Sequence, residues 1–111
     1  MQTLKIKNLL IAIALGVVFL NPVQASTTFG NSDCGEWVNK SKSTPTMRSW
    51  LIGYMSGLSV MHTLNNKNDD PLDKINSVQQ IYVWMDNYCQ NNPLKSVMYG
   101  GTTLFIELGK K

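Results

Sequence analysis

The stretch TMRSWLIGYMSGLSVMHTL, residues 46–64, is the most regular part of the sequence and decides the fold class. Its large apolar side chains recur three or four positions apart, at Met47, Trp50 or Leu51, Tyr54, Leu58 and Met61. This spacing is typical of an α-helix that buries one face. We therefore expect a long helix in the middle of a helical domain.

Gly53 and Gly57 lie one turn apart within this predicted helix. Each glycine weakens a helix by about 1 kcal/mol relative to alanine, so a pair of them indicates a packing reason. A membrane pair with this spacing needs an apolar segment of about twenty residues, whereas this stretch contains Arg48 and His62. We expect another helix of the same domain to pack closely on Gly53 and Gly57.

Helix-start signals on either side of this stretch define three further helices. Asp33 and Glu36 have the spacing of a capping box and open a short helix at 33–38. Asp70 and Pro71 begin a short turn at 71–75, which leads into a main helix at 78–90.

The last helix is predicted to start with Asn92 as its cap and Pro93 at its first position, and to end before Gly109. Its inner face would carry Leu94, Val97, Met98, Gly101, Leu104 or Phe105, and Leu108. Since no alternating strand pattern of convincing length occurs, the sequence predicts an all-α domain of four helices, the first of them short.

The N-terminus has the three parts of a secretory signal peptide. Lys5 and Lys7 precede the apolar run LLIAIALGVVFL at 9–20, and NPVQA at 21–25 supplies a cleavage site after Ala25. The apolar run is shorter than the roughly 20 residues that span a bilayer. We expect residues 1–25 to be removed, leaving a single exported domain at 26–111 with a loose leader at 26–31 and no stable membrane insertion.

The two signal lysines account for most of the formal net charge of +3, and the mature chain has eight basic and seven acidic side chains. No basic cluster remains except at Lys110 and Lys111. Nucleic-acid binding needs a concentrated positive surface, so nucleic acid is not an expected partner.

Cys34 and Cys89 are the only two cysteines. In an exported protein an isolated pair of this kind indicates a disulfide, and only one intramolecular pairing exists. A metal site would need several further ligands, but His62 is the only histidine and no CxxC motif occurs. We predict a Cys34–Cys89 disulfide and no metal or other cofactor.

No residue group indicates catalysis. His62 lies near the end of the predicted 46–64 helix, where it would complement the helix dipole. The acidic residues have helix-start, loop or surface explanations, and no nucleophile–base arrangement or phosphate loop occurs. Gly100 and Gly101 fit close helix packing better than a phosphate loop. The sequence therefore predicts a protein that is not an enzyme.

Aromatic residues and methionines are frequent for a chain with so few charges: three Trp, four Tyr and six Met. Most of them should build the core of a small domain. The remainder would form a surface for a protein partner or a homodimer, where Trp, Tyr and Met are favoured. Trp84 and Tyr99 are the candidate partner-binding residues.

The layout resembles the HdeA/HdeB group of small periplasmic acid-stress chaperones. The resemblance lies in CGEWV at the start of the domain, the central WLIGYMSGL, and WMDNYCQNNP before the last helix, and it covers most of residues 32–108. WLIGYMSGL followed by NPLKSVMYGGTTLFIEL is also similar to the Rap1a/Tai group of periplasmic immunity proteins.

The two resemblances imply different functions in the periplasm of a Gram-negative bacterium. An HdeA/HdeB-like chaperone would expose apolar surface in acid and hold many unfolded clients. A Rap1a/Tai-like immunity protein would bind one secreted effector at neutral pH. The position of the two cysteines favours the chaperone, and immunity is kept as the alternative.

Overall fold

A computed structural model describes residues 27–39, 43–66 and 68–111, so the predicted signal peptide lies outside the described residues. The elements are α2 (Cys34–Val38), α3 (Pro45–Asn65), the 3-10 helix η2 (Pro71–Lys74), α4 (Val78–Asn91) and α5 (Val97–Leu108). These residues form no strand, only an isolated bridge between Asp33 and Ser96. The all-α prediction with four α-helices, the first short, is confirmed.

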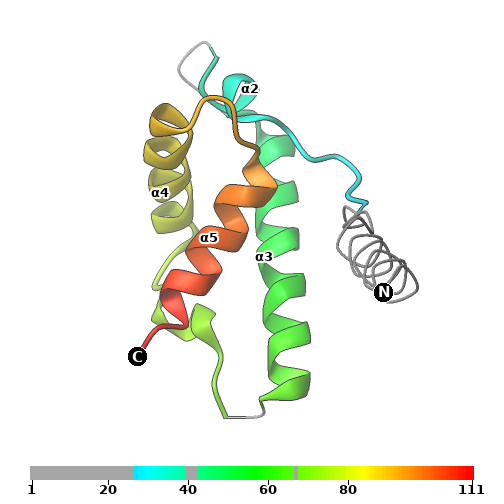
Figure 1. Cartoon of the computed structure of the whole chain (residues 1–111), viewed down its shortest axis with the longest axis vertical. Coiled ribbons are helices and arrows are strands. Elements are labelled where there is room, and N and C mark those ends of the chain that lie inside the picture. Colours follow the sequence, from blue (N-terminus) through cyan, green and yellow to red (C-terminus); the bar gives the residue numbers. More distant parts are fainter. Residues whose placement is uncertain (1–26, 40–42, 67) are drawn as a thin grey trace, which may run out of the picture.

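The helix α5 holds the domain together. It crosses between α3 and α4 and packs on both of them and on η2, while α2 packs on α4 at the opposite end from η2 (Figure 1). Among the described residues, no helix is both long enough and apolar enough to cross a membrane.

The start of α2 is attached to the start of α5. The predicted capping box forms, with Asp33 accepting from the Glu36 amide at 2.7 Å and Glu36 accepting from the Asp33 amide at 3.2 Å. Backbone hydrogen bonds of 2.9 Å run from Cys34 to Lys95 and from Val97 to Ser32. The predicted Cys34–Cys89 disulfide is present, with a Cα–Cα distance of 4.7 Å, and joins α2 to α4.

The predicted start of the last helix is wrong. Asn92 and Pro93 belong to a turn, and α5 begins at Val97 with Ser96 as its cap. Leu94, assigned to the inner face, is 97% exposed. The physical reason is the backbone pairing just described, which keeps Ser96 extended against the chain before α2 and delays the start of the helix.

The core consists of nine buried apolar side chains from α2, α3, α4 and α5: Cys34, Trp37, Leu51, Met55, Ile81, Met85, Cys89, Val97 and Leu104. Gly100 and Gly101 bring α5 close to both neighbours. A Cβ on Gly100 would lie 2.6 Å from the Met85 sulfur, and one on Gly101 would lie 3.2 Å from Cδ1 of Tyr54. The close packing expected at this glycine pair is confirmed.

The close packing predicted for Gly53 and Gly57 is wrong. Both residues are exposed, and a Cβ added to either would meet no atom within 4 Å. The reason is that α3 contacts α5 through the opposite face, which carries Leu51 and Met55. The close helix contact that the sequence predicts at Gly53 and Gly57 of α3 is formed instead at Gly100 and Gly101 of α5.

The chain before α2, part of the segment predicted to be a loose leader, makes several contacts. Asn31 accepts from the Met98 amide at 2.9 Å, and the Thr28 hydroxyl lies 2.9 Å from the Met98 sulfur. The carbonyl of Phe29 accepts a hydrogen bond from the Trp50 indole. Residues 28–31 are therefore attached to α3 and α5, because polar groups of both elements find their partners there.

Candidate functional site

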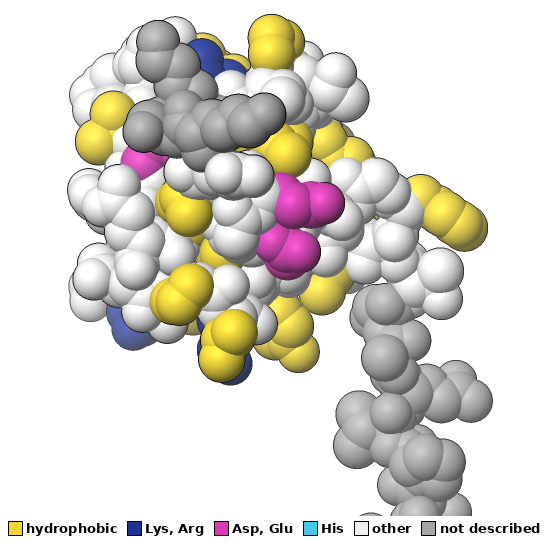
Figure 2. Space-filling view, turned by 90° about the horizontal axis from the view of Figure 1, so that it is seen from above, with side chains coloured by type: hydrophobic (Ala, Val, Ile, Leu, Met, Phe, Trp, Pro, Cys, Tyr) yellow, Lys and Arg dark blue, Asp and Glu magenta, His cyan; other side chains and the backbone are white. Residues whose placement is uncertain are grey.

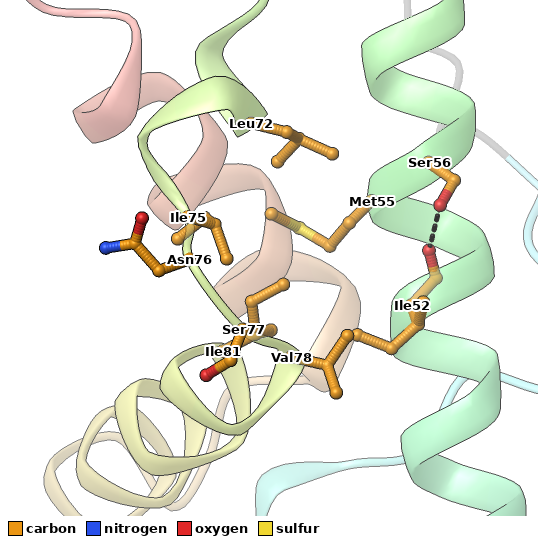
Figure 3. A pocket seen from close by; sticks show the side chains of 9 residues that line it. All are labelled: Ile52, Met55, Ser56, Leu72, Ile75, Asn76, Ser77, Val78 and Ile81. Carbon is orange, nitrogen blue, oxygen red and sulfur yellow. Dashed lines mark hydrogen bonds between the residues drawn. The ribbon is translucent and has the colours of Figure 1, made fainter.

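A pocket of about 280 Å³ lies between α3, η2 and α4 (Figure 3). It is lined by Ile52, Met55, Ser56, Leu72, Ile75, Asn76, Ser77, Val78 and Ile81. Six of these nine side chains are aliphatic or methionine, three are small and polar, and none carries a charge. A hollow with this lining is suited to an apolar group.

Helical spacing explains which side chains α3 and α4 place in the pocket. Ile52 and Met55 are three positions apart on α3, as are Val78 and Ile81 on α4, so each pair lies on one face. Met55 and Ile81 are almost completely buried, at 1% and 4% exposure, while Val78 is 43% exposed. Met55 and Ile81 therefore form the floor of the pocket, and Val78 lies toward its mouth.

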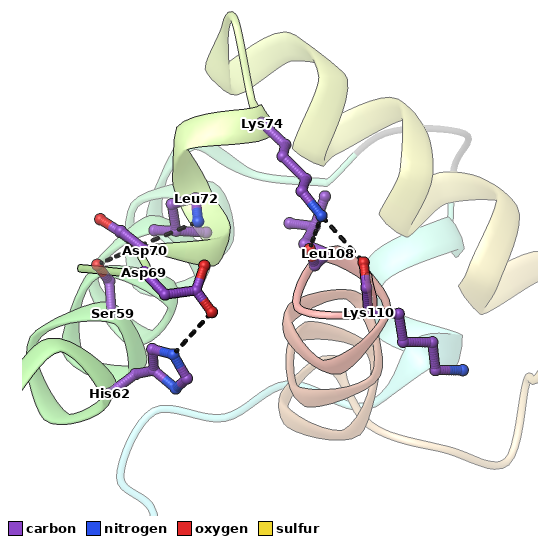
Figure 4. A network of polar contacts seen from close by, with 8 residues as sticks. All are labelled: Ser59, His62, Asp69, Asp70, Leu72, Lys74, Leu108 and Lys110. Carbon is purple, nitrogen blue, oxygen red and sulfur yellow. Dashed lines mark hydrogen bonds and ion pairs between the residues drawn. The ribbon is translucent and has the colours of Figure 1, made fainter. Parts of the chain in front are cut away.

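The third wall is η2, which carries Leu72 and is followed by Ile75. Asp70 caps this short helix by accepting from the Leu72 amide at 3.0 Å, and the same carboxylate oxygen accepts from the Ser59 hydroxyl of α3 at 2.8 Å (Figure 4). At the other end of η2, the Lys74 ammonium donates to the carbonyls of Leu108 and Lys110. Polar side chains thus fasten both ends of η2.

At the other end of the domain, a carboxylate also fastens α2. The indole nitrogen of Trp37, a side chain with no exposed surface, donates to Asp86 of α4 at 2.7 Å. The two carboxylates of the capping box, Asp33 and Glu36, order the first turn of α2. Four of the seven acidic side chains therefore accept hydrogen bonds that hold the two short helices, α2 and η2.

His62 lies in the last turn of α3, as predicted. Its Nε2 atom is 3.8 Å from an Asp69 carboxylate oxygen, and its ring meets the Phe105 ring edge-on at 5.7 Å between centroids. That nitrogen is buried and has no hydrogen-bond partner. Within the described ranges, no three His, Cys, Asp or Glu side chains are grouped as metal ligands would be.

Of the two candidate partner-binding residues, Trp84 is half-buried and Tyr99 is 56% exposed. Trp84 stacks on Tyr88 at 5.2 Å between centroids, and with Val83 it lines a shallow hollow of about 430 Å³ on the outer side of α4. Tyr99 lies on α5, where the Lys95 ammonium is 5.5 Å from its ring centroid. Tyr99 does not line the hollow that contains Trp84, so the two residues belong to different surfaces.

Other large apolar side chains are exposed at scattered places on the domain. Besides Tyr99, those exposed are Phe29, Val60, Met61, Leu64, Val78, Val83, Leu94 and Ile106. The view from the end that carries α2 shows hydrophobic side chains at several separate places on this face, with acidic and basic side chains among them (Figure 2). The described surface thus offers apolar contacts in many directions.

Sequence reasoning did not find the pocket. It expected a turn at 71–75, but it gave Ile52 no role and did not foresee that Leu72 and Ile75 would face α3. The available signal was Asp70-Pro71 followed by two apolar residues three positions apart, which marks a short helix with a single apolar side. Comparison of the chain with protein-family models, curated proteins and solved structures found no match.

Proposed function

We propose that this protein is a periplasmic acid-stress chaperone of the HdeA/HdeB kind, which binds unfolded proteins without catalysis or a cofactor. The observation that carries the proposal is the use of carboxylates to fasten α2 and η2. The attachment of the two short helices that cover the apolar interior therefore depends on charged acceptors.

The hydrogen bonds concerned have charged acceptors, which makes them stronger than bonds between neutral groups. Asp86 holds the indole of Trp37, and Asp70 holds η2 to Ser59. Replacing these carboxylates by neutral groups should therefore weaken the attachment of both short helices.

Charge repulsion between side chains would provide the response to acid. The mature chain has a net charge of +1 at neutral pH, and full protonation of its carboxylates and of His62 would raise the sum of side-chain charges to +9. Self-repulsion of this kind destabilises a compact state. The Cys34–Cys89 disulfide would still limit how far the chain can open.

The test is light scattering by an acid-denatured client protein at pH 2–3, with pH 7 as the control. We expect the mature protein to suppress aggregation at the acidic pH in proportion to its amount, and to have little effect at pH 7. Equal aggregation with and without the protein at every ratio would contradict the proposal.

A second candidate function is that of an immunity protein that neutralises one secreted effector. The observation favouring it is the pocket between α3, η2 and α4, which is already formed in the folded domain and could receive one side chain of a folded partner. Stoichiometric capture of a single folded secreted hydrolase at pH 7, with loss of the hydrolase activity, would support this candidate against the chaperone.

A further inference from the structure

We infer that the pocket between α3, η2 and α4 is a binding site for one uncharged aliphatic side chain of a protein partner, and that η2 is its movable cover. The inference rests on the proposed function in one respect, namely that the partner is a protein. It adds that the bound group is an uncharged aliphatic side chain and that movement of η2 lets this group enter the pocket.

The size of the pocket fits one such group. A dry cavity of about 150 Å³ is enough to hold benzene, and this pocket measures about 280 Å³. The floor, formed by Met55 and Ile81, is almost completely buried. An apolar group that reached this floor would exchange water for contacts with aliphatic side chains, which is favourable for each methylene that is buried.

The residues that line the pocket also disfavour binding of a charged group. None of the nine residues around the pocket is charged, so a charged group would lose water without gaining a counter-ion. The Ser56 hydroxyl already donates to the Ile52 carbonyl at 2.7 Å (Figure 3). Asp73 and Lys74, on η2, are not lining residues, and Lys74 is bound to the end of α5.

The cover follows from the way η2 is attached. This four-residue helix supplies one wall through Leu72, with Ile75 directly after it. Its polar side-chain fastenings lie at its two ends, at Asp70 and at Lys74 (Figure 4). Loss of the Asp70–Ser59 hydrogen bond would leave the N-terminal end of η2 held to the domain by the buried Pro71 and would make opening of the pocket mouth easier.

The binding test uses hexanol as an uncharged aliphatic probe, followed by amide chemical shifts of the folded protein at pH 7. We expect shifts at the pocket residues, and much weaker shifts with hexanoate or hexylammonium at equal concentration. Val78→Phe fills the mouth and should weaken hexanol binding by about tenfold or more. The matched control is Val83→Phe, an exposed valine on the same helix that does not line this pocket, which should bind hexanol like the wild type.

Ser56→Leu provides a second blocking variant, from the α3 side, should Val78→Phe fail to fold. Hexanol shifts located elsewhere, equal shifts with the charged probes, or undiminished binding by a folded blocking variant would each overturn the inferred site. Because this experiment is done at pH 7 without a client, its failure is distinguishable from failure of the acid light-scattering assay.

The cover is tested with Ser59→Ala, which removes the α3 partner of Asp70. The amides of Asp73 and Ile75 bond within or directly beside η2, and we expect their hydrogen exchange to become roughly twofold to tenfold faster, as loss of one hydrogen bond implies. Ser49→Ala, an exposed serine of the same helix, is the control and should change nothing. Unchanged exchange in Ser59→Ala would show that η2 is not held by this contact.

Discussion

The two short helices, α2 and η2, lie at opposite ends of the domain and are attached in different ways. The first, α2, carries Cys34 of the disulfide and the fully buried Trp37, and backbone pairing fixes its start. In η2, Pro71 is buried and Leu72 is half-buried, and polar side chains fasten the two ends. Of the two short helices, only α2 has a covalent attachment to the rest of the domain.

This difference indicates how the domain would respond to acid. Loss of the carboxylate charges would loosen both short helices, but the disulfide would keep α2 next to α4. The η2 end has no covalent restraint, so the apolar pocket beneath η2 would be the first part of the interior to open.

Removal of the disulfide should have the largest effect. Cys89→Ser should lower the free energy of unfolding by roughly 2–5 kcal/mol, and a loss at the upper end of this range would abolish folding. Urea unfolding of the oxidised wild type and the variant measures this, with reduced wild type as the control. Equal stability of all three would mean that the disulfide at the α2 end does not add to the stability of the domain.

The next largest effect is expected at Gly100, which lies near the disulfide end. A side chain there would run into Met85 and Tyr88 of α4. Gly100→Leu should therefore cost ~1–3 kcal/mol or more through overpacking, seen as a sharp drop in melting temperature. A melting temperature equal to that of the wild type would show that α4 and α5 are not in close contact at this end.

Gly53 and Gly57 form the matched control for Gly100, because nothing lies within 4 Å of the position of their Cβ atoms. Gly53→Ala and Gly57→Ala should each stabilise the domain by up to about 1 kcal/mol through helix propensity. Thermal melts distinguish this outcome from the destabilisation that a packed glycine would give.

The smallest effect is expected at the η2 end. Lys74→Met removes the contacts with the carbonyls of Leu108 and Lys110. Because Lys74 is exposed, its loss should cost less than about 1 kcal/mol of global stability. Hydrogen exchange should nevertheless become faster at η2 and unchanged at α2. Faster exchange at both ends would contradict the independence of the two attachments.

The helices themselves could be predicted from the sequence, because apolar periodicity and caps are local signals. The capping box of Asp33 and Glu36, the turn at Asp70-Pro71 and the Cys34–Cys89 pairing are all present in the fold. The start of α5 could not be predicted in this way, since it depends on backbone pairing between segments more than sixty residues apart.

The packed glycine pair and the pocket show a second limit. Gly53 and Gly57 have the spacing of a helix contact, yet they lie on the side of α3 that faces solvent. Which side of α3 packs against α5 depends on how α3, α4 and α5 pack together, and not on the sequence of α3 alone. The pocket is likewise made by three elements. Its lining residue Ile52 is unremarkable within its own segment, and the local signal at Leu72 and Ile75 does not indicate that they pack against α3.

The central claim is that carboxylates at the two ends keep the apolar interior covered at neutral pH. Its most direct test is client light scattering at pH 7 with the double variant Asp70→Asn/Asp86→Asn, which neutralises the acceptors that fasten η2 and α2 while retaining their shape. The control is Asp73→Asn/Glu107→Gln, which changes the net charge equally at two exposed carboxylates that accept no hydrogen bond from the described residues. We predict that the Asp70/Asp86 variant suppresses aggregation of a chemically denatured client at pH 7, while the control variant and the wild type do not. If the Asp70/Asp86 variant leaves scattering as high as the control does, the claim is contradicted.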